Sequence, residues 1–504
     1  MLLTLNDLKL KPSQSEKQLV ALCQKKLRAP VRYFKILKKS LDARDKGDIR
    51  WVYSVECSDK PYTHPTRTFE KITKPMPRVY IIGAGPAGLF CALRLLDHGI
   101  RPVLIERGKP VEERAKDVAI FRDSGKLDTN SNVQFGEGGA GTFSDGKLFT
   151  QTKSPLNREI LDTFVRFGAP EEVGYLGKPH VGSDNLTKVV KNIREYILKE
   201  GGQIRFSSLF TGAQIKDGKL QSVTINGVNE DADELVLAIG HSARDTFEAL
   251  LHSGFHLEQK EFAAGVRIEH LQANISKAQY GEKYSLLPPA DYKLVSHAGE
   301  RSAFTFCMCP GGEVIPSASN EGEIVTNGMS YFARDGKNAN SALVVQIKKE
   351  DFQSEHPLAG VTFQKKIEQA AYAAGSGKAP VQLVGDFLAG KESFRFQEVM
   401  PTYSAGTAFA DLTAVLPDVI GNTLKAALAD MDRKLAGFAS PDAVLTGVET
   451  RTSSPVRILR EENLEAAGIA GVFPCGEGAG YAGGITSSAA DGLRVAEQIA
   501  KKYF

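Results

Sequence analysis

The sequence has 504 residues, of which 42% are hydrophobic and 24% are charged, so it is too long for one core and has the composition of a globular protein with roughly two to four domains. No segment approaches the roughly 18 uninterrupted apolar residues that predict a transmembrane helix. The start of the chain, MLLTLNDLKLK, lacks the apolar centre of a signal peptide. The six cysteines form no C-x-x-C pair, which favours reduced thiols in a cytoplasmic protein with no membrane association.

The formal net charge of +3 is unevenly distributed, because residues 1–74 contain 17 Lys and Arg against 8 Asp and Glu. Their apolar patterns predict strands at 2–10, 31–40 and 49–57 and a helix at 15–27, followed by a proline-containing linker. We therefore expect a small α+β domain over residues 1–74. Its basic character is typical of a solvated helix face, and the alternative is contact with an RNA. The residues that suggest this alternative are Lys25, Lys26, Arg28, Arg32, Lys35, Lys38 and Lys39.

A strand, a glycine turn, a helix and a second strand follow one another between residues 78 and 108. The apolar run 79–82 predicts a buried parallel strand, residues 89–96 repeat apolar side chains at helical spacing, and residues 103–105 predict a second buried strand. The turn after the first strand reads GAGPAG, which is the G-x-G-x-x-G pattern of dinucleotide sites. The segment is therefore predicted to be a Rossmann-like unit.

Each residue of this pattern has a physical role in binding a dinucleotide. Gly83 permits the tight turn, Gly85 lets the backbone approach a pyrophosphate, and Gly88 lets the helix pack on the strand. Glu106 ends the second strand, where a carboxylate can accept hydrogen bonds from the hydroxyls of an adenosine ribose. The positive end of the helix then faces the diphosphate. The alternative is a tight turn that binds no ligand.

The loop at residues 134–146, QFGEGGAGTFSDG, contains four glycines within six residues. Its backbone carries few side chains and many exposed N–H groups, which suits close contact with a flat polar ring or with phosphates. The alternative is a flexible surface loop. Because the loop follows the dinucleotide unit closely, we favour contact with the cofactor.

The remaining sequence predicts a second part of the same site. Residues 203–240 predict a β-meander that returns to a buried strand, LVLAIG, and residues 470–485 predict a strand and a glycine turn that lead into a final helix. Between them, alternating strands followed by helices predict an α+β domain. We therefore expect this domain to be a cap inserted into the nucleotide-binding domain, with boundaries at 75–260, 261–443 and 444–504.

These motifs resemble a known family. GAGPAG with Glu106, LVLAIG at 235–240 and GVFPCGEGAGYAGGI at 471–485 resemble glutathione-reductase-like FAD-binding oxidoreductases. With GGAGTFSDGKL at 138–148, the chain resembles more closely a poorly characterised group of bacterial FAD-dependent dehydrogenases that have a small N-terminal domain. The resemblance implies an α/β fold: a Rossmann-like FAD-binding domain with a β-meander, an inserted α+β cap domain and a small α+β N-terminal domain.

The resemblance also implies which residues contact FAD. The first glycine turn would line the pyrophosphate, the glycine loop would approach the flavin ring, and the final helix would begin at the flavin pyrimidine. Glu477 stands where the family usually has an aspartate and would hold the ribitol. The residues assigned to FAD in this way are Gly83, Gly85, Pro86, Ala87, Gly88, Glu106, Arg107, Gly139, Ala140, Gly141, Thr142, Phe210, Ala238, Gly240, Gly476, Glu477, Gly483, Gly484 and Ile485.

Three residues are candidates for catalysis. Arg451 could hold a substrate carboxylate, His270 could transfer protons near neutral pH, and Cys309 could act with its neighbour Cys307 in thiol redox chemistry. A structural role is the alternative for each: an interdomain ion pair, a core histidine and buried thiols. No metal site is predicted, because no fourth ligand is recognisable by its spacing.

The motifs favour an FAD-dependent oxidoreductase that transfers a hydride between the flavin N5 and either an unidentified small molecule or NAD(P)H. The sequence has one dinucleotide motif and no C-x-x-x-x-C pair, unlike disulfide reductases. Two alternatives come from other classes. One is an RNA-associated flavoprotein that uses the basic N-terminal domain, and the other is a flavin-binding sensor without turnover.

Overall fold

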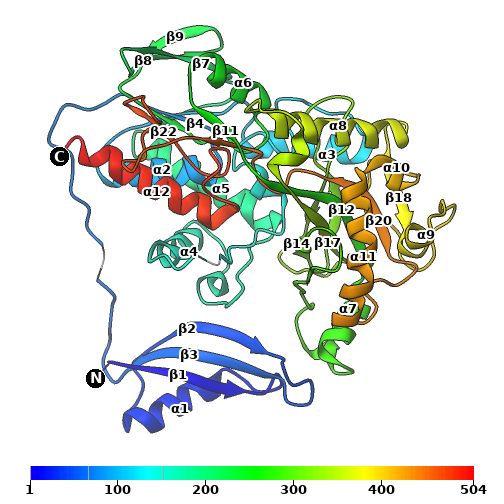
Figure 1. The fold of residues 1–504 in the computed structure, drawn as a ribbon. Coiled ribbons are helices and arrows are strands. Elements are labelled where there is room, and N and C mark those ends of the chain that lie inside the picture. Colours follow the sequence, from blue (N-terminus) through cyan, green and yellow to red (C-terminus); the bar gives the residue numbers. More distant parts are fainter. Residues whose placement is uncertain (1, 66, 151) are drawn as a thin grey trace.

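The computed structural model describes residues 2–65, 67–150 and 152–504. Met1, Thr66 and Gln151, which fall within the predicted domain ranges, lie outside the described residues. Figure 1 shows a small N-terminal domain that is joined by an extended segment to a larger body. The body contains a parallel sheet next to α12 and a second sheet, which forms the cap, beside it.

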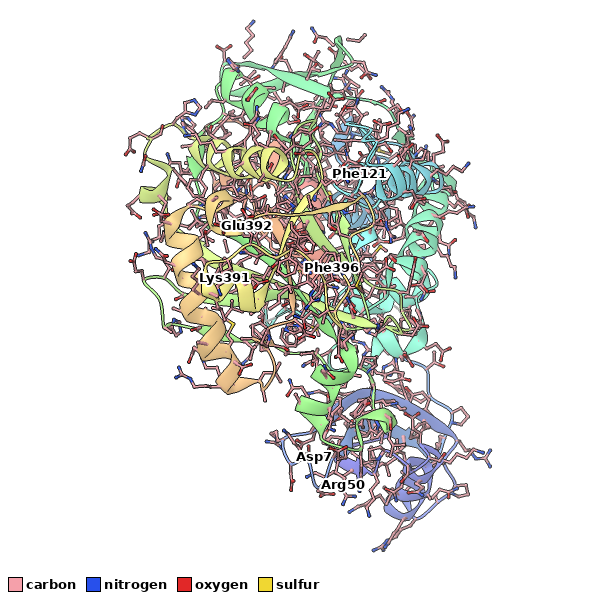
Figure 2. The ribbon with its side chains drawn as sticks, turned by 90° about the vertical axis from the view of Figure 1, so that its right-hand side faces the viewer. Asp7, Arg50, Phe121, Lys391, Glu392 and Phe396 are labelled. Carbon is pink, nitrogen blue, oxygen red and sulfur yellow. The ribbon has the colours of Figure 1, made fainter. Side chains whose placement is uncertain are left out.

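The small domain, which lies below the larger body in Figure 2, is a three-stranded antiparallel sheet with one helix on one face. The sheet has the order β1-β3-β2, and the helix contributes Leu19, Cys23 and Leu27 to a core with Tyr53 and Val55. Alternation of apolar and polar residues in the strands and the helical spacing of these side chains place the apolar atoms between the two layers. The elements are β1 (Leu2–Leu10), α1 (Lys17–Leu27), β2 (Tyr33–Asp42) and β3 (Arg50–Ser58).

The small domain contacts the body through the outer edge of β2. The backbone N–H of Lys39 donates to the carbonyl of Tyr175 at 2.8 Å, and the N–H of Gly177 donates to the carbonyl of Lys39 at 2.7 Å. The side chain of Lys39 pairs with Glu16 at 2.7 Å and lies over the ring of Trp51. At least one basic side chain of this domain is therefore engaged in contacts within the protein.

A five-stranded parallel sheet forms the core of the body, with the order β22-β10-β4-β5-β6. Helices α2, α5 and α12 pack on one face, and a three-stranded meander packs on the other. The C-terminal strand β22 pairs with β10, so the chain returns to this sheet after the cap. The elements are β4 (Val79–Ile82), α2 (Pro86–Asp97), β5 (Val103–Ile105), α5 (Ser183–Lys199), β6 (Gln203–Arg205), β7 (Phe210–Lys216), β8 (Lys219–Ile225), β9 (Val228–Asp231), β10 (Glu234–Leu237), β22 (Val472–Pro474) and α12 (Ile485–Lys501).

Further helices surround this core. Among the residues described, no helix combines the length and the apolar character that crossing a bilayer requires. The helices are α3 (Val111–Ser124), α4 (Leu156–Arg166) and α6 (Arg244–His252), with short 3₁₀ helices η1 (Ala140–Phe143) and η2 (Glu171–Gly174).

The cap is built on a seven-stranded sheet with the order β13-β14-β17-β12-β20-β18-β19. Helices α8 and α11 pack against it around a large apolar core. Its strands and helices are β12 (Phe262–Leu271), α7 (Gln272–Tyr280), η3 (Tyr284–Leu286), β13 (Val295–Ser296), β14 (Ala303–Cys309), β17 (Asn338–Ile347), η4 (Lys349–Phe352), α8 (Ala359–Ala374), β18 (Ala379–Leu383), α9 (Val384–Ala389), β19 (Thr407–Phe409), α10 (Leu412–Val415), α11 (Asp418–Lys434) and β20 (Val444–Glu449). A small antiparallel pair, β15 (Glu313–Pro316) with β16 (Thr326–Met329), completes it. A second pair, β11 (Leu257–Gln259) with β21 (Val456–Ile458), packs in the core of the parallel sheet and its meander.

The structure corrects one predicted boundary. The cap was expected to end at residue 443, but β20 (Val444–Glu449) lies in the cap sheet between β12 and β18. The cap therefore extends to at least Glu449. The sequence of β20 is a buried apolar run, which fits any central strand, so its pattern alone does not identify the sheet to which it belongs.

Close packing of α2 against α12 can be tested with one added methyl group. A Cβ atom at Gly492 would lie 2.1 Å from the carbonyl oxygen of Ala87, whereas a Cβ atom at Gly421, in α11, meets no atom within 4 Å. We expect Gly492→Ala to lower the free energy of unfolding by about 1–3 kcal/mol through overpacking. The matched control Gly421→Ala should raise it by about 0.5–1 kcal/mol. Urea unfolding of the two variants measures both effects, and equal effects would contradict the packing.

A candidate active site between the parallel sheet and the cap

One cavity connects the parallel sheet to the cap sheet. It encloses about 1530 Å³, including space that is open to solvent. Its walls come from the turn after β4, the glycine loop, the segment after β10, the turn before α12, and the cap strands β14, β16 and β20. The predicted site residues that line it are Gly83, Gly85, Pro86, Ala87, Glu106, Arg107, Gly139, Ala140, Gly141, Phe210, Ala238, Gly240, Glu477, Gly483, Gly484, Ile485, Cys309 and Arg451.

The carboxylate of Glu106 connects three segments of this wall. Its Oε2 accepts a hydrogen bond from the backbone N–H of Ala84 at 2.9 Å. Its Oε1 accepts from the N–H of Gly108 at 2.9 Å and from the N–H of Gly136 at 3.0 Å. Ala84 lies in the first glycine turn and Gly136 in the glycine loop, so one buried carboxylate fixes the distance between the two loops. A carboxylate has about four acceptor positions, which leaves capacity for a further donor from the cavity.

The glycines of the site fit an extended dinucleotide. Gly83 has φ +102°, and a Cβ atom there would lie 2.3 Å from the carbonyl oxygen of Ala238, so the turn requires glycine. By contrast, a Cβ atom at Gly240, Gly483 or Gly484 would meet no protein atom within 4 Å. All three line the cavity, so the missing side chains leave space there for a ligand rather than for protein.

Glu477 presents a carboxylate to the cavity. Burial raises its pKa to about 7, and the nearby Lys260 opposes this effect only in part. The carboxylate is therefore available as a hydrogen-bond acceptor, or as a donor when it is protonated. Arg107, on the opposite wall, pairs with Asp245 and lies over the ring of Phe135 at 4.4 Å.

Four predicted site residues do not line this cavity. Gly88 packs behind the first turn, where a Cβ atom would lie 1.9 Å from the carbonyl oxygen of Gly83, and Gly476 packs against Ala87. Thr142 faces a small neighbouring cavity between α2 and α5. These three residues lie behind the wall of the large cavity, and their contact with FAD stays a prediction.

His270 is the fourth, and its predicted catalytic role is wrong. The imidazole is buried in the cap core, where Nε2 hydrogen-bonds to the carbonyl of Phe438 at 2.7 Å. Burial lowers its pKa to about 4, so the ring stays neutral near pH 7. It packs against Tyr292 and Phe438 and acts as a core histidine.

Arg451 and Cys309 line the cavity and have other partners. The guanidinium of Arg451 is buried and pairs with Glu323 and Glu368, each at 3.0 Å. The same carboxylates bind Arg244 of α6, so Arg451 belongs to an ion-pair network between the cap and the parallel-sheet domain. The buried thiol of Cys309 donates to the carbonyl of the exposed Cys307 at 3.3 Å, and burial raises the pKa of the Cys309 thiol.

The structure adds lining residues that the sequence analysis did not single out. Lys147, after the glycine loop, and Glu449, at the end of the cap strand β20, line the cavity, as do His241 and Gln134. Lys147 is the residue after the glycine loop, at the end of the motif SDGK. Its position beside four glycines is the one sequence signal that could have identified it.

Comparison with protein families matches three segments of the chain. Residues 261–452 match a family described as "FAD-dependent protein, C-terminal domain-like", residues 76–118 match "FAD binding domain", and residues 2–58 match a domain of unknown function. An uncharacterized protein of Clostridium beijerinckii is 47% identical over 491 residues, which cover 93% of this chain and 92% of the relative. The FAD-binding match contains β4, α2 and β5, which line the cavity, and the cofactor of this chain is FAD.

Three solved structures are among those that match this chain, and the names of the first two mention FAD or flavin. CtdE in complex with FAD is 11% identical and covers 84% of this chain and 87% of its own, with a TM-score of 0.33. The flavin-dependent brominase Bmp2 is 13% identical (85% and 79%, TM-score 0.39), and the L-amino acid deaminase from Proteus vulgaris is 12% identical (86% and 96%, TM-score 0.34). These TM-scores are below 0.5, so nothing about activity is inferred from them.

The comparisons bear on both resemblances that the sequence analysis described. The likeness to glutathione-reductase-like proteins is matched only as an FAD-binding domain. The likeness to a poorly characterised bacterial group with a small leading domain agrees with the clostridial relative and with the separate match at residues 2–58.

Filling the open space at the start of α12 should block FAD without unfolding the protein. Because a Cβ atom at Gly484 meets no protein atom within 4 Å, the side chain of Gly484→Leu would enter the cavity. We expect FAD affinity to fall at least about ten-fold, equivalent to about 1.4 kcal/mol, in a fluorescence titration of the FAD-free protein. The thermal midpoint of the FAD-free variant should stay within about 2 °C of the parent. Unchanged FAD affinity would show that the cofactor does not occupy this space.

The glycine loop contains a buried carboxyl whose protonation should affect stability. Burial raises the pKa of Glu137 to about 7, although Oε2 accepts from the N–H of Val111 at 2.7 Å and pairs with Arg194 at 2.8 Å. In the unfolded chain the pKa of a glutamate is about 4.3. The folded state therefore holds the proton more tightly, and stability falls as the pH rises from about 4.3 through about 7.

The variant Glu137→Gln carries an amide that does not ionise, so it lacks this pH dependence. We expect the free energy of unfolding of the parent to decrease relative to the variant between about pH 5 and about pH 8. Urea unfolding of the FAD-free proteins at constant ionic strength measures the difference. A difference that is constant across this range would contradict the raised pKa.

Proposed function

We propose that this chain, which belongs to the same family as the uncharacterized Clostridium beijerinckii protein, is an FAD-dependent oxidoreductase. It would act on a small molecule in the cap half of the cavity. The observation that carries this proposal is the continuity of the cavity. One space runs from the first glycine turn, beside β4, to cap residues of β14 and β20. Such a space can hold a dinucleotide along the sheet and a second molecule against the cap.

Residues of the parallel-sheet half would hold FAD. The turn at residues 83–85 precedes α2, whose first N–H groups have no acceptor within the helix and favour a phosphate. Glu106 has acceptor capacity left for a ribose hydroxyl, and Glu477 offers a carboxylate to a polyol. When bound, FAD supplies the hydride acceptor and donor, and the protein orients it and adjusts its electronic environment.

The N-terminus of α12 would favour negative charge in the cavity. The helix has 17 residues and begins after Gly484, which lines the cavity. Its first turn has free N–H groups and the positive end of the helix dipole. This electrostatic environment stabilises an anionic ligand, or an anionic form of the cofactor, relative to a neutral one.

Two routes would reduce the cofactor. A small-molecule substrate bound against the cap could transfer a hydride directly, or NAD(P)H could dock transiently in the same half of the cavity. The second route is compatible with one dinucleotide motif in the sequence, because a transient nucleotide needs no dedicated domain. An anaerobic reduction experiment separates the two.

The proposal predicts a bound flavin that a substrate or a nicotinamide can reduce. We expect the purified protein, supplied with FAD, to show a flavin absorbance band around 450 nm that bleaches under anaerobic conditions with NADH, NADPH or a member of a metabolite panel. The FAD-depleted variant Gly484→Leu serves as the control for reduction of free FAD. Absence of the band would contradict FAD binding. A stable band that no donor bleaches would contradict turnover and favour a flavin-binding sensor.

A further inference from the structure

The cap half of the cavity contains one ammonium group whose charge is not balanced. Lys147 follows the glycine loop, lines the cavity and keeps 33% of its side chain exposed. Its Nζ donates to the carbonyl of Met308. The carboxylate nearest to it, Asp145, lies 3.5 Å away, which is longer than a charge-assisted hydrogen bond.

Asp145 cannot neutralise Lys147, because a second cation holds it. Arg334 donates to both carboxylate oxygens of Asp145, and Ser330 donates to Oδ1. The group of three thus has two positive charges and one negative charge. An ammonium has three N–H donors, so Lys147 has donors left for a ligand in the cavity.

The other charged residues of the cap wall are already paired. Arg267 donates to both oxygens of Glu449, at 2.9 and 2.8 Å, and Thr326 donates to the same carboxylate. Arg451 is held by Glu323 and Glu368 as described above. The excess charge on this wall is therefore one positive charge, and it is located at Lys147.

We propose that Lys147 binds the carboxylate of a monoanionic substrate. This inference rests on the proposed function, since it assigns the substrate class of the same cavity. A partly buried cation without a balancing anion is costly, and a ligand carboxylate would remove that cost. A single excess charge matches a monoanion better than a phosphate dianion. The cation keeps its charge near neutral pH, because the Asp145 carboxylate raises its pKa in spite of burial.

The test uses carboxylates and their neutral amides as paired probes of the FAD-loaded protein. Acetate with acetamide, propionate with propionamide, and benzoate with benzamide are titrated while the flavin absorbance spectrum is recorded. We expect at least one carboxylate to perturb the spectrum and to bind at least about ten-fold more tightly than its amide, because a charge-assisted hydrogen bond is lost in the amide. If no carboxylate binds more tightly than its amide, the proposal is wrong.

Variants of Lys147 then test whether the preference for the carboxylate depends on this residue. We expect Lys147→Met to weaken carboxylate binding at least about ten-fold and to leave amide binding unchanged, and Lys147→Arg to retain most of the affinity. Lys178→Met is the matched control, because Lys178 is an exposed lysine that pairs with Asp291. If Lys147→Met does not fold or retain FAD, Lys147→Gln replaces it. The paired-probe titration of the parent protein decides the question independently.

Two further results separate this inference from the proposed function. If the parent has no flavin absorbance, the proposed function fails before any probe is added. If Lys147→Met changes the reduction potential of the bound flavin but leaves carboxylate affinity unchanged, Lys147 acts on the cofactor, and the substrate assignment is overturned.

Discussion

The geometry of the site depends on one buried carboxylate, which positions the backbone of the segments around it. Glu106 accepts hydrogen bonds from the N–H groups of Ala84, Gly108 and Gly136, and these lie in three separate segments. Hydrogen bonds to a charged acceptor contribute more than neutral ones, and removing the acceptor would leave three buried donors without partners. The spacing between the first glycine turn and the glycine loop therefore follows from this residue. A direct backbone hydrogen bond, from the N–H of Gly138 to the carbonyl of Ala84 at 2.8 Å, joins the same two loops, and both loops line the cavity.

The sequence predicted the parts of the site that are local. The unit β4-α2-β5 spans a short segment, and its glycines have requirements that neighbouring atoms impose, such as the carbonyl of Ala238 beside Gly83. The return of the C-terminal segment was also predictable, because a strand, a glycine turn and a helix recur there, and β22 pairs with β10. FAD followed from the combination of these motifs.

Features that depend on long-range pairing were not predictable. Arg451 was proposed as a substrate contact, but Glu323 and Glu368 meet it only after the cap has folded. His270 looked like a proton-transfer group, and its burial against Phe438 depends on the packing of the segment that follows α11. Lys147 was not singled out, since a lysine after a glycine loop is usually a solvated residue. Its significance comes from Arg334, which is far away in sequence and occupies the carboxylate of Asp145.

The attachment of the small domain has a further effect. In its sheet, of order β1-β3-β2, the strand β2 has an outer edge that no other strand of the described part of the domain covers. Lys39 of that edge exchanges hydrogen bonds with Tyr175 and Gly177 of the body. An unpaired edge strand is a template for pairing with other chains. Separation of the small domain would expose the backbone N–H and carbonyl of Lys39, which would then be able to pair with a strand of another chain.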